Sequence, residues 1–509
     1  MPKIGDLIQK FIMSNPDRAN KFFASRSTEW WEKQGEKKAL NTFHEAAEKV
    51  SAYKDFLKKN GIENHEKIQT IEDFKKYVPV TTKENYIFHY DLNERLLEPY
   101  SNFFTLATTS GTTGEPVFWP RNSFQDKMTS LYFEMMARNI WQTQKKSTLV
   151  VVCFSLGNYI AGELNSWFWK DIALRNKGLL TVATPGSDLE GTLVVAKKFI
   201  DHYDQIIFGA YPYFFKLFLD TGEKNGINWK KYNIKFYYGG EGMSRDFRQN
   251  LINKFAKEPK ELNNIVDVYG TADAGGISYG NCLTSLIQEF IVSNKNLQTK
   301  ILGKERNVVS LTQLNTSAYF VEEKDENLII TFRGSVPLIR YNIQDIGGIV
   351  PFKKVLEIFR EEGVDILNEL KEKAPYFKPY AQPFLFVEGR ESCISLDGAN
   401  VFPTTIQDII DKSSHFTSFK LSKKTDENGD WRFYVYLELK EDKNITQEEE
   451  VKLKEDYKHL ILNVLLTRNH DFKRSYEDNS ELCIPRIEIR KFGEDEFKLS
   501  KSGKVKFII

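Results

Sequence analysis

The sequence predicts an α/β protein: a large N-terminal multi-sheet α/β domain with flanking helices, followed by a small C-terminal α+β domain of the ferredoxin-like type. Three patterns lead to this fold class. The chain opens with a polar helical stretch, its middle alternates short apolar runs with helical patterns, and its last stretch follows the order β-α-β-β-α-β. The change of pattern near residue 390 separates two predicted domains, residues 1–389 and residues 390–509.

The opening stretch, up to about residue 95, is predicted to be helical with Lys and Glu on its exposed faces. Residues 41–60 carry apolar side chains close to helical spacing. These are Phe43, Ala46, Ala47, Val50 and Ala52. Residues 68–90 continue with short helices, which Pro79 interrupts.

The middle of the chain is predicted to form a mostly parallel sheet. Its continuous apolar runs read as buried strands over residues 148–154, 178–183, 205–208, 234–238 and 265–269. Helical patterns over residues 193–203 and 213–226 lie between them, which is typical of a sheet covered on both faces. Residues 310–321 and 328–333 favour antiparallel strands and a barrel-like subdomain.

The last stretch has a different arrangement of elements. A strand over residues 384–388 ends at Gly389, and the hairpin of residues 416–423 and 431–439 turns at Asn428-Gly429, because this pair supplies positive φ. The remaining predicted elements are a strand over residues 394–396, helices over 403–412 and 446–468, and a strand over 485–491.

Charge and cysteine content exclude several classes of protein. The 71 Lys and Arg residues nearly balance the 70 Asp and Glu residues, which argues against a nucleic-acid clamp or a protein of anionic membranes. The four cysteines are scattered, so neither a disulfide framework nor a zinc module is indicated. No apolar run is long enough for a membrane span, and the first residues lack a secretory signal pattern. We therefore expect a cytoplasmic protein without nucleic-acid or membrane partners.

The segment Thr108-Thr109-Ser110-Gly111-Thr112-Thr113-Gly114-Glu115-Pro116 is the most informative motif. Its glycines let the backbone approach an anion closely, and the N–H groups and hydroxyls together form a donor-rich nest for phosphate oxygens. It is not a Walker A loop, because no Gly-Lys pair stands at the required place. The alternative is an ordinary surface turn. The density of hydroxyls and glycines favours phosphate binding.

This motif resembles the phosphate-binding loop of the adenylate-forming superfamily, which contains the acyl-CoA and aryl-CoA synthetases. Further segments resemble that superfamily's motifs in the same order. They are Tyr238-Gly239-Gly240-Glu241, Tyr269-Gly270-Thr271-Ala272-Asp273, Arg340-Tyr341-Asn342-Ile343-Gln344-Asp345, Gly389-Arg390 and Ser502-Gly503-Lys504. The resemblance extends from about residue 41 to the C-terminus, and the ordered set is more specific than any one match.

Within the superfamily, the chain is most similar to the phenylacetate–CoA ligase-like branch. The segments that indicate this branch are Pro79-Val80-Thr81-Thr82-Lys83, Leu338-Ile339-Arg340-Tyr341 and Gly398-Ala399-Asn400-Val401-Phe402-Pro403. The chain departs from the family pattern at three positions, since Asp273 replaces a usual Glu, Ser392 a usual Asp or Lys, and Glu115 a frequent Lys.

The resemblance implies an active site between the two domains and a role for each matched residue. Lys504 and Asp273 would be catalytic, with Lys504 at the α-phosphate of ATP and Asp273 holding Mg²⁺; Lys501 and Lys506 are close rivals of Lys504. Tyr269 would stack on adenine, and Asp345 would accept hydrogen bonds from ribose hydroxyls. The other nucleotide-binding residues would be Thr109, Ser110, Gly111, Thr112, Thr113, Gly114, Gly239, Gly240, Glu241, Gly270, Thr271 and Arg390. Tyr211, Tyr238 and Gly275 are assigned to the pocket for the acid; Tyr211 comes from an aromatic run outside the matched motifs, which is most often core but is also typical of an apolar acyl pocket.

The activity that the resemblance implies is ATP-dependent activation of a small carboxylic acid to an acyl adenylate, followed by transfer to a thiol. The expected ligands are ATP, Mg²⁺ and coenzyme A as acceptor. Two alternatives stay open: transfer to a carrier protein or an amine, and a catalytically inactive nucleotide-binding relic that acts as a partner. The sequence does not distinguish aryl from fatty acyl acids.

Overall fold

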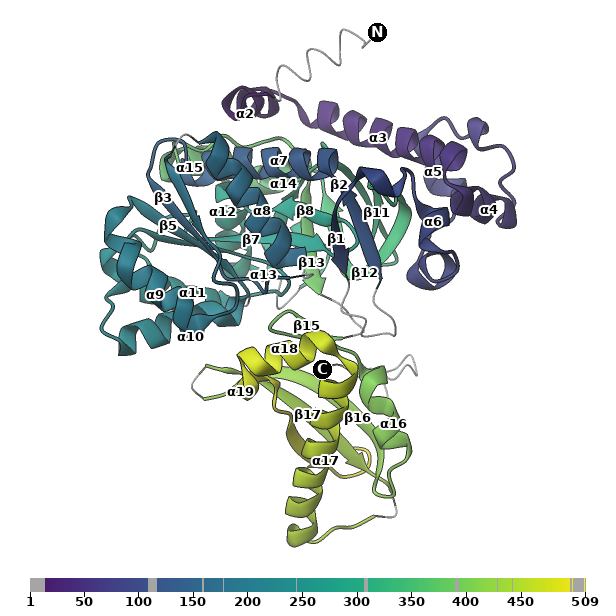
Figure 1. Cartoon of the computed structure of the whole chain (residues 1–509), viewed down its shortest axis with the longest axis vertical. Helices are drawn as coiled ribbons and strands as arrows, with labels where there is room; N and C mark the ends of the chain where they lie inside the picture. The colour runs from purple at the N-terminus through teal and green to yellow at the C-terminus, as the bar shows by residue number, and fades with distance from the viewer. Residues whose placement is uncertain are drawn as a thin grey trace. The chain divides into compact units, whose positions relative to one another are not determined.

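The computed structural model describes residues 14–108, 117–157, 160–176, 178–243, 245–305, 310–389, 393–427, 429–441 and 443–494, together with residues 497 and 508. The described residues divide into two compact units, and the larger one ends at Gly389. The larger unit is a multi-sheet α/β domain, and the smaller one is an α+β domain, as the sequence predicts. Each unit is shown in Figure 1.

The larger unit begins with helices, as expected. They are α2 (Pro16–Ala24), α3 (Thr28–Lys49), α4 (Ser51–Lys59), α5 (Ile71–Tyr77) and α6 (Leu92–Arg95), with a π-helical turn, η2 (Lys83–Ile87). The predicted helix over residues 41–60 is broken at Val50, whose backbone is extended and whose side chain is fully buried. A β-branched residue that packs into the core at this point lets the chain bend between α3 and α4.

Eleven strands of the described residues form one sheet in the order β10-β11-β12-β13-β9-β8-β7-β6-β5-β3-β4. In chain order they are β3 (Thr148–Val152), β4 (Leu180–Ala183), β5 (Gln205–Ala210), β6 (Ile234–Tyr238), β7 (Ile265–Thr271), β8 (Gly275–Tyr279), β9 (Ser310–Leu314), β10 (Tyr319–Lys324), β11 (Asn327–Phe332), β12 (Leu338–Val350) and β13 (Phe384–Gly389). Strands β3 to β7 pair in parallel, and β7 to β13 pair antiparallel. A separate hairpin consists of β1 (Phe103–Thr108) and β2 (Phe118–Asn122).

Helices cover both faces of the parallel strands, because successive residues of a strand point to opposite faces. On β6, Phe236 packs against Phe215 of α10 (Pro212–Lys224), with ring centroids 4.1 Å apart. Its neighbour Tyr237 accepts a 2.9 Å hydrogen bond from Trp169 of α8 (Ile160–Arg175) on the other face. In Figure 1, α9 (Leu189–Phe199), α10 and α11 (Arg245–Phe255) lie together beside β3 and β5.

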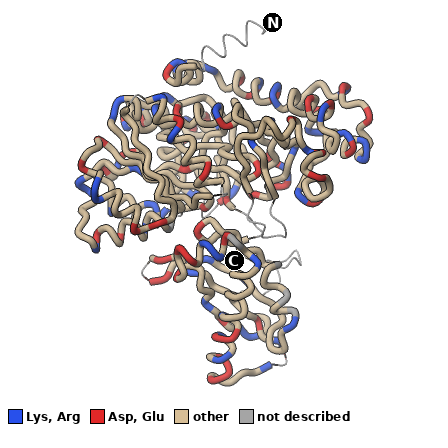
Figure 2. The backbone as a smooth tube through the Cα atoms, viewed as in Figure 1, with Lys and Arg blue, Asp and Glu red and all other residues tan. Residues whose placement is uncertain are grey.

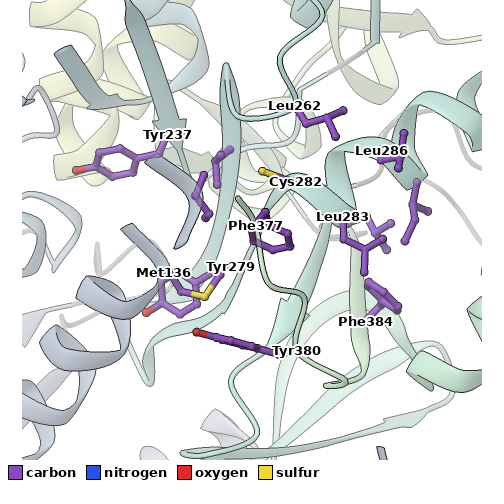
Figure 3. Close-up of a cluster of buried hydrophobic side chains, with 14 of the residues drawn as sticks. Met136, Tyr237, Leu262, Tyr279, Cys282, Leu283, Leu286, Phe377, Tyr380 and Phe384 are labelled. Atoms are coloured by element: carbon purple, nitrogen blue, oxygen red, sulfur yellow. The ribbon is translucent and has the colours of Figure 1, made fainter. Parts of the chain in front are cut away.

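The main hydrophobic core lies between the sheet and the helices α7 (Ser123–Trp141) and α12 (Cys282–Ser293). Figure 3 shows Met136 of α7, Tyr237 and Tyr279 of the sheet, and Leu283 of α12 within this cluster. The remaining helices on this unit are α13 (Lys295–Leu302), α14 (Phe352–Glu361) and α15 (Ile366–Lys373). Figure 2 shows that charges of both signs are interspersed on the helices, whereas the strands of this unit are mostly uncharged.

The smaller unit contains a three-stranded sheet within its described residues. Strand β17 (Trp431–Leu439) pairs antiparallel with β16 (Phe416–Thr425) and parallel with β18 (Arg486–Arg490). The helices are α16 (Pro403–Asp411), α17 (Gln447–Arg468), α18 (His470–Asp478) and α19 (Ser480–Cys483). Ile508 forms an isolated parallel bridge with Leu421 at the β16 edge.

One predicted strand of this unit lies outside its sheet. Strand β14 (Ile394–Leu396) pairs with β15 (Ala399–Val401) in a hairpin of its own. The two turn residues, Asp397 and Gly398, have φ values of 49° and 85°. Two successive positive φ values are typical of a type I′ turn, which closes a hairpin with a two-residue loop. Strand β14 therefore pairs with its neighbour β15 in the sequence and not with the three-stranded sheet. None of the helices in the described ranges is both long and apolar enough to cross a membrane.

Candidate functional site

Most of the predicted site residues in the described ranges lie at the carboxyl ends of neighbouring parallel strands. Tyr211 follows β5, Gly239 follows β6, and Tyr269 lies near the end of β7. These ends are adjacent, because Ala210 pairs with Tyr238 and Tyr238 pairs with Asp267. We call Tyr211, Gly239, Gly240, Glu241, Tyr269, Gly270, Thr271, Asp273 and Asp345 the strand-end cluster. Ligands of open α/β sheets bind outside the carboxyl ends of the strands.

Gly239 and Gly240 allow close packing at the end of β6. Gly240 has φ +82°, and a Cβ added there would lie 2.8 Å from Cε1 of Tyr211. A Cβ at Gly239 would lie 2.7 Å from the carbonyl oxygen of Val268 on β7. The Tyr211 ring also packs edge-on against Phe154, with centroids 5.2 Å apart. The backbone after β6 therefore lies directly against an aromatic ring, and Glu241 follows at a half-buried position.

We expect Gly240→Ala to impair ligand binding as well as stability. The new methyl would meet the Tyr211 ring, and the αL backbone would cost about 1–2 kcal/mol in addition. Gly226→Ala is the matched control, since Gly226 has φ +80° and nothing within 4 Å of an added Cβ. The melting temperature should fall in both variants, and more in Gly240→Ala because of the added contact, whereas nucleotide affinity measured by calorimetry should fall only for Gly240→Ala. Equal affinities in both variants would contradict a ligand site at Tyr211.

The predicted metal-binding aspartate lies in a tight hairpin loop between β7 and β8. Gly270 faces the carbonyl of Gly275, where an added Cβ would approach the oxygen to 2.5 Å. The Thr271 hydroxyl accepts a 3.2 Å hydrogen bond from the amide of Ala274 and so stabilises the loop. Asp273 lies within this loop and is half-buried. The short loop holds the Asp273 carboxylate beside the end of β7.

Two tyrosine–aspartate hydrogen bonds join this hairpin region to β12. Tyr269 of β7 donates to Oδ2 of Asp345 at 2.6 Å, and Tyr341 of β12 donates to Oδ2 of Asp273 at 2.7 Å. In each of the two segments an aspartate follows a tyrosine by four positions. The tyrosine of each segment donates a hydrogen bond to the aspartate of the other segment. The structure brings Tyr269, Asp273 and Asp345 together, although residues 269 and 345 are 76 positions apart.

Strong curvature of the sheet makes these hydrogen bonds reachable. Strands β7 and β12 are separated by β8, β9 and β13, which in a flat sheet would place them about 19 Å apart. The register of β12 against β11 also shifts, with Asn327 opposite Ile346 but Ile329 opposite Asn342. Gln344, in this bulge, has φ +62°. Bulges bend a strand and re-aim its side chains, which here directs Asp345 toward Tyr269.

Tyr238 lies in a buried polar network and is 2% exposed. Burial raises the pKa of the Tyr238 hydroxyl well above its usual value, and the neighbouring Asp267 carboxylate raises it further. Asp267 is itself paired with Arg248 at 3.1 Å and accepts a 3.0 Å hydrogen bond from Ser310. Tyr238 is therefore neutral at physiological pH, and its place in the acid pocket stays a prediction.

Arg121 is a residue near the site that the sequence analysis missed. An added Cβ on Gly275, which has φ +84°, would lie 2.9 Å from Nη1 of Arg121. Arg121 is 2% exposed and donates from Nε to Asp126 at 2.7 Å. Asp126 also accepts a 3.0 Å hydrogen bond from Thr105 of β1. Arg121 and Asp126 are five positions apart, but the packing of Arg121 against Gly275 of the β7–β8 hairpin is long-range, so that no local sequence pattern indicates it.

The donor set at Asp273 fits a magnesium ion bound together with a triphosphate. Mg²⁺ usually takes one or two carboxylates and completes its coordination with phosphate oxygens and water. Asp273 makes no ion pair with the described cationic residues, and it is accessible enough to meet a ligand. One oxygen of the Asp273 carboxylate, Oδ2, accepts the hydrogen bond from Tyr341. The other oxygen, Oδ1, is the one that would contact the ion.

Several predicted residues lie outside the described parts of the chain. They are Thr109, Ser110, Gly111, Thr112, Thr113, Gly114, Arg390 and Lys504. Their assignment to nucleotide binding and catalysis stays a prediction from the sequence.

The fold is that of 2-hydroxyisobutyryl-CoA ligase. The structure of that enzyme with 2-HIB-AMP and CoA in the thioesterification state is similar over 93% of this chain and 89% of its own, with a TM-score of 0.59 and 14% identity. An open conformation of the same enzyme, also with 2-HIB-AMP and CoA, covers 92% of this chain and 89% of its own, with a TM-score of 0.50 and 13% identity. No protein-family model matches the sequence, and a search of curated proteins gives no match. At these identities the likeness establishes the fold.

Proposed function

We propose that this protein activates a carboxylic acid with ATP to form an acyl adenylate and then transfers the acyl group to a thiol, most readily that of coenzyme A. The observation that carries the proposal is the pairing of Tyr269 with Asp345 and of Tyr341 with Asp273 at the carboxyl ends of the parallel strands. These residues come from segments that resemble nucleotide-binding motifs. Similarity of fold to a CoA ligase supports the same conclusion.

Each residue has a defined task in this proposal. Asp345 accepts hydrogen bonds from the ribose hydroxyls, and Tyr269, tied to Asp345 at 2.6 Å, presents its ring to the adenine. A substrate carboxylate oxygen attacks the α-phosphorus, and pyrophosphate leaves. The ammonium of Lys504 stabilises the negative charge that develops on the α-phosphate. Mg²⁺ at Asp273, when bound, would neutralise triphosphate charge.

In the second step a thiolate sulfur attacks the acyl carbon, a thioester forms and AMP leaves. The thiol proton passes to solvent or to the departing phosphate oxygen. Positioning of the two reactants supplies much of the rate, since no covalent intermediate with the protein is required. A carrier-protein phosphopantetheine or an amine could replace coenzyme A at this step without change to the first step.

Pyrophosphate exchange into ATP tests the first step directly. A panel of aryl, short-chain and long-chain acids should contain at least one that supports exchange above the acid-free rate. A thermal-shift screen with ATP and Mg²⁺ should select the same acid, because a tightly bound adenylate stabilises the folded state by mass action. ATP binding with no exchange for any acid would favour a nucleotide-binding relic. Adding coenzyme A, a phosphopantetheinyl carrier or an amine to the active acid then identifies the acceptor.

Asp345→Asn is expected to weaken ATP binding about 10- to 100-fold, because the amide loses charge-assisted hydrogen bonds to the ribose hydroxyls. The amide oxygen can still accept from Tyr269, so the fold should be preserved. Asp325→Asn is the matched control, since Asp325 lies in the exposed β10–β11 turn with φ 52°, a conformation that asparagine tolerates. Calorimetric titration with ATP measures both variants. An unchanged dissociation constant for Asp345→Asn would remove Asp345 from the nucleotide site.

A further inference from the structure

Asp273, like Asp345, contacts a tyrosine hydroxyl, whereas several other buried carboxylates of the larger unit are paired with an arginine. Asp126 is paired with Arg121, Asp267 with Arg248, and Glu322 with Arg340. Asp273 instead accepts a hydrogen bond from a neutral tyrosine hydroxyl, and no described lysine or arginine forms an ion pair with it. The Asp273 carboxylate therefore has no protein cation among the described residues to compete with a cation from outside the chain.

Tyr341 is held rigidly where it meets this carboxylate. Its side chain is 0% exposed, and its ring lies near Trp119, with centroids 6.4 Å apart. Thr81 clamps the backbone on both sides of Tyr341: its amide donates to the carbonyl of Arg340 at 3.0 Å, and its carbonyl accepts from the amide of Asn342 at 2.9 Å. The hydroxyl of Tyr341 is therefore a fixed donor.

The second tyrosine–aspartate pair joins the hairpin segment to β12 at another point. Tyr269 is in the same hairpin segment as Asp273, and its hydroxyl is bonded to Asp345 on the strand that also carries Tyr341. The hairpin and β12 are thus tied at two points. A displacement of the whole hairpin away from β12 would have to break both hydrogen bonds.

We propose that Tyr341 is a positioning residue that orients the Asp273 carboxylate for the divalent cation bound with ATP; this inference rests on the proposed function. The Tyr341 hydroxyl holds Oδ2 and leaves Oδ1 to meet the cation. An aspartate has one methylene less than a glutamate and therefore less reach, so that its orientation has to be set by its neighbours. Outer-shell hydrogen bonds of this kind orient ligating carboxylates and affect metal affinity about 10- to 100-fold.

The test compares Tyr341→Phe with Tyr319→Phe in the full-length protein. Tyr319 is 1% exposed, and its hydroxyl donates a 2.8 Å hydrogen bond to the carbonyl of Ala274, the residue next to Asp273. Removal of this hydroxyl therefore breaks a similar buried hydrogen bond but leaves the contacts of the Asp273 carboxylate unchanged. The readout is Mn²⁺ affinity measured by electron paramagnetic resonance in the presence of a non-hydrolysable ATP analogue. We expect Tyr341→Phe to weaken Mn²⁺ binding about 10-fold, and Tyr319→Phe to leave it within about 2-fold.

A second measurement separates this inference from the proposed function. In pyrophosphate exchange, Tyr341→Phe should raise the Mg²⁺ concentration for half-maximal rate, with the maximal rate largely regained at high Mg²⁺. Equal Mn²⁺ affinities in the two tyrosine variants would overturn the inference and leave the hydroxyl a structural role. Absence of exchange in the unmodified protein would instead reject the proposed function, while the Mn²⁺ titration would still decide the role of Tyr341.

Asp273→Asn keeps the test decisive if Tyr341→Phe does not fold. The amide oxygen still accepts from Tyr341, so the melting temperature should be nearly unchanged, while loss of the charge should weaken Mn²⁺ binding to the complex of the protein with the ATP analogue at least as much as Tyr341→Phe is expected to weaken it. Retention of Mn²⁺ affinity in Asp273→Asn would show that this carboxylate holds no cation and would overturn the proposal.

Discussion

Lys504→Ala is expected to reduce pyrophosphate exchange at least about 100-fold while the melting temperature stays unchanged. The reason is that the side chain would act on charge that develops at the α-phosphate in the transition state, and removal of one such donor costs about 10²–10³ in rate. ATP should still bind, since Asp345 and the Ser/Thr/Gly loop make separate contacts in the proposed complex. The measurement is exchange at saturating acid, with ATP affinity determined in parallel.

Lys501→Ala and Lys506→Ala are the matched controls, because both lysines lie within three positions of Lys504 and carry the same charge. A loss of exchange in all three variants would indicate a general electrostatic contribution of this segment. A loss confined to Lys501→Ala or Lys506→Ala would move the catalytic role to that lysine. Undiminished exchange in Lys504→Ala would contradict the assigned role.

Arg121→Ala is expected to give the largest loss of stability among single substitutions near the site. Asp126 is 0% exposed and would be left as an uncompensated buried charge, which typically costs about 3–5 kcal/mol. The same change removes the guanidinium against which the backbone of Gly275 packs. Urea unfolding followed by tryptophan fluorescence should show a lower midpoint, and ATP binding should weaken because the β7–β8 hairpin loses its support.

Two further variants serve as a control for the loss of stability and as a test of its cause. Lys231→Ala removes one partner of an exposed pair, with Lys231 and Asp201 66% and 60% exposed, and should change the unfolding midpoint little. Arg121→Met combined with Asp126→Leu should regain most of the lost stability, since a buried ion pair can be replaced by apolar residues of similar volume. A double variant as unstable as Arg121→Ala would mean that hydrogen bonds such as that from Thr105, rather than charge pairing, dominate at this position.

The sequence by itself determined the fold class and the order of its main elements. Continuous apolar runs predicted β3, β5, β6 and β7, because strands covered on both faces need apolar residues at every position. The smaller unit's main hairpin and its long helix α17 also follow from local signals, since turn residues and helical periodicity act within a few positions. The residues of the strand-end cluster other than Tyr211 could be selected from motif resemblance, although their contacts could not.

Tertiary structure decided how those residues meet. The curvature of the eleven-stranded sheet brings β12 to β7, and only then do Tyr341 and Asp273, 68 positions apart, form a hydrogen bond. The guanidinium of Arg121 likewise packs against Gly275, which belongs to a strand far away in the sequence. Local patterns report on burial and turn preference, which depend on near neighbours in the chain. Contacts between distant strands depend on sheet curvature and register, which are set by the packing of the whole domain.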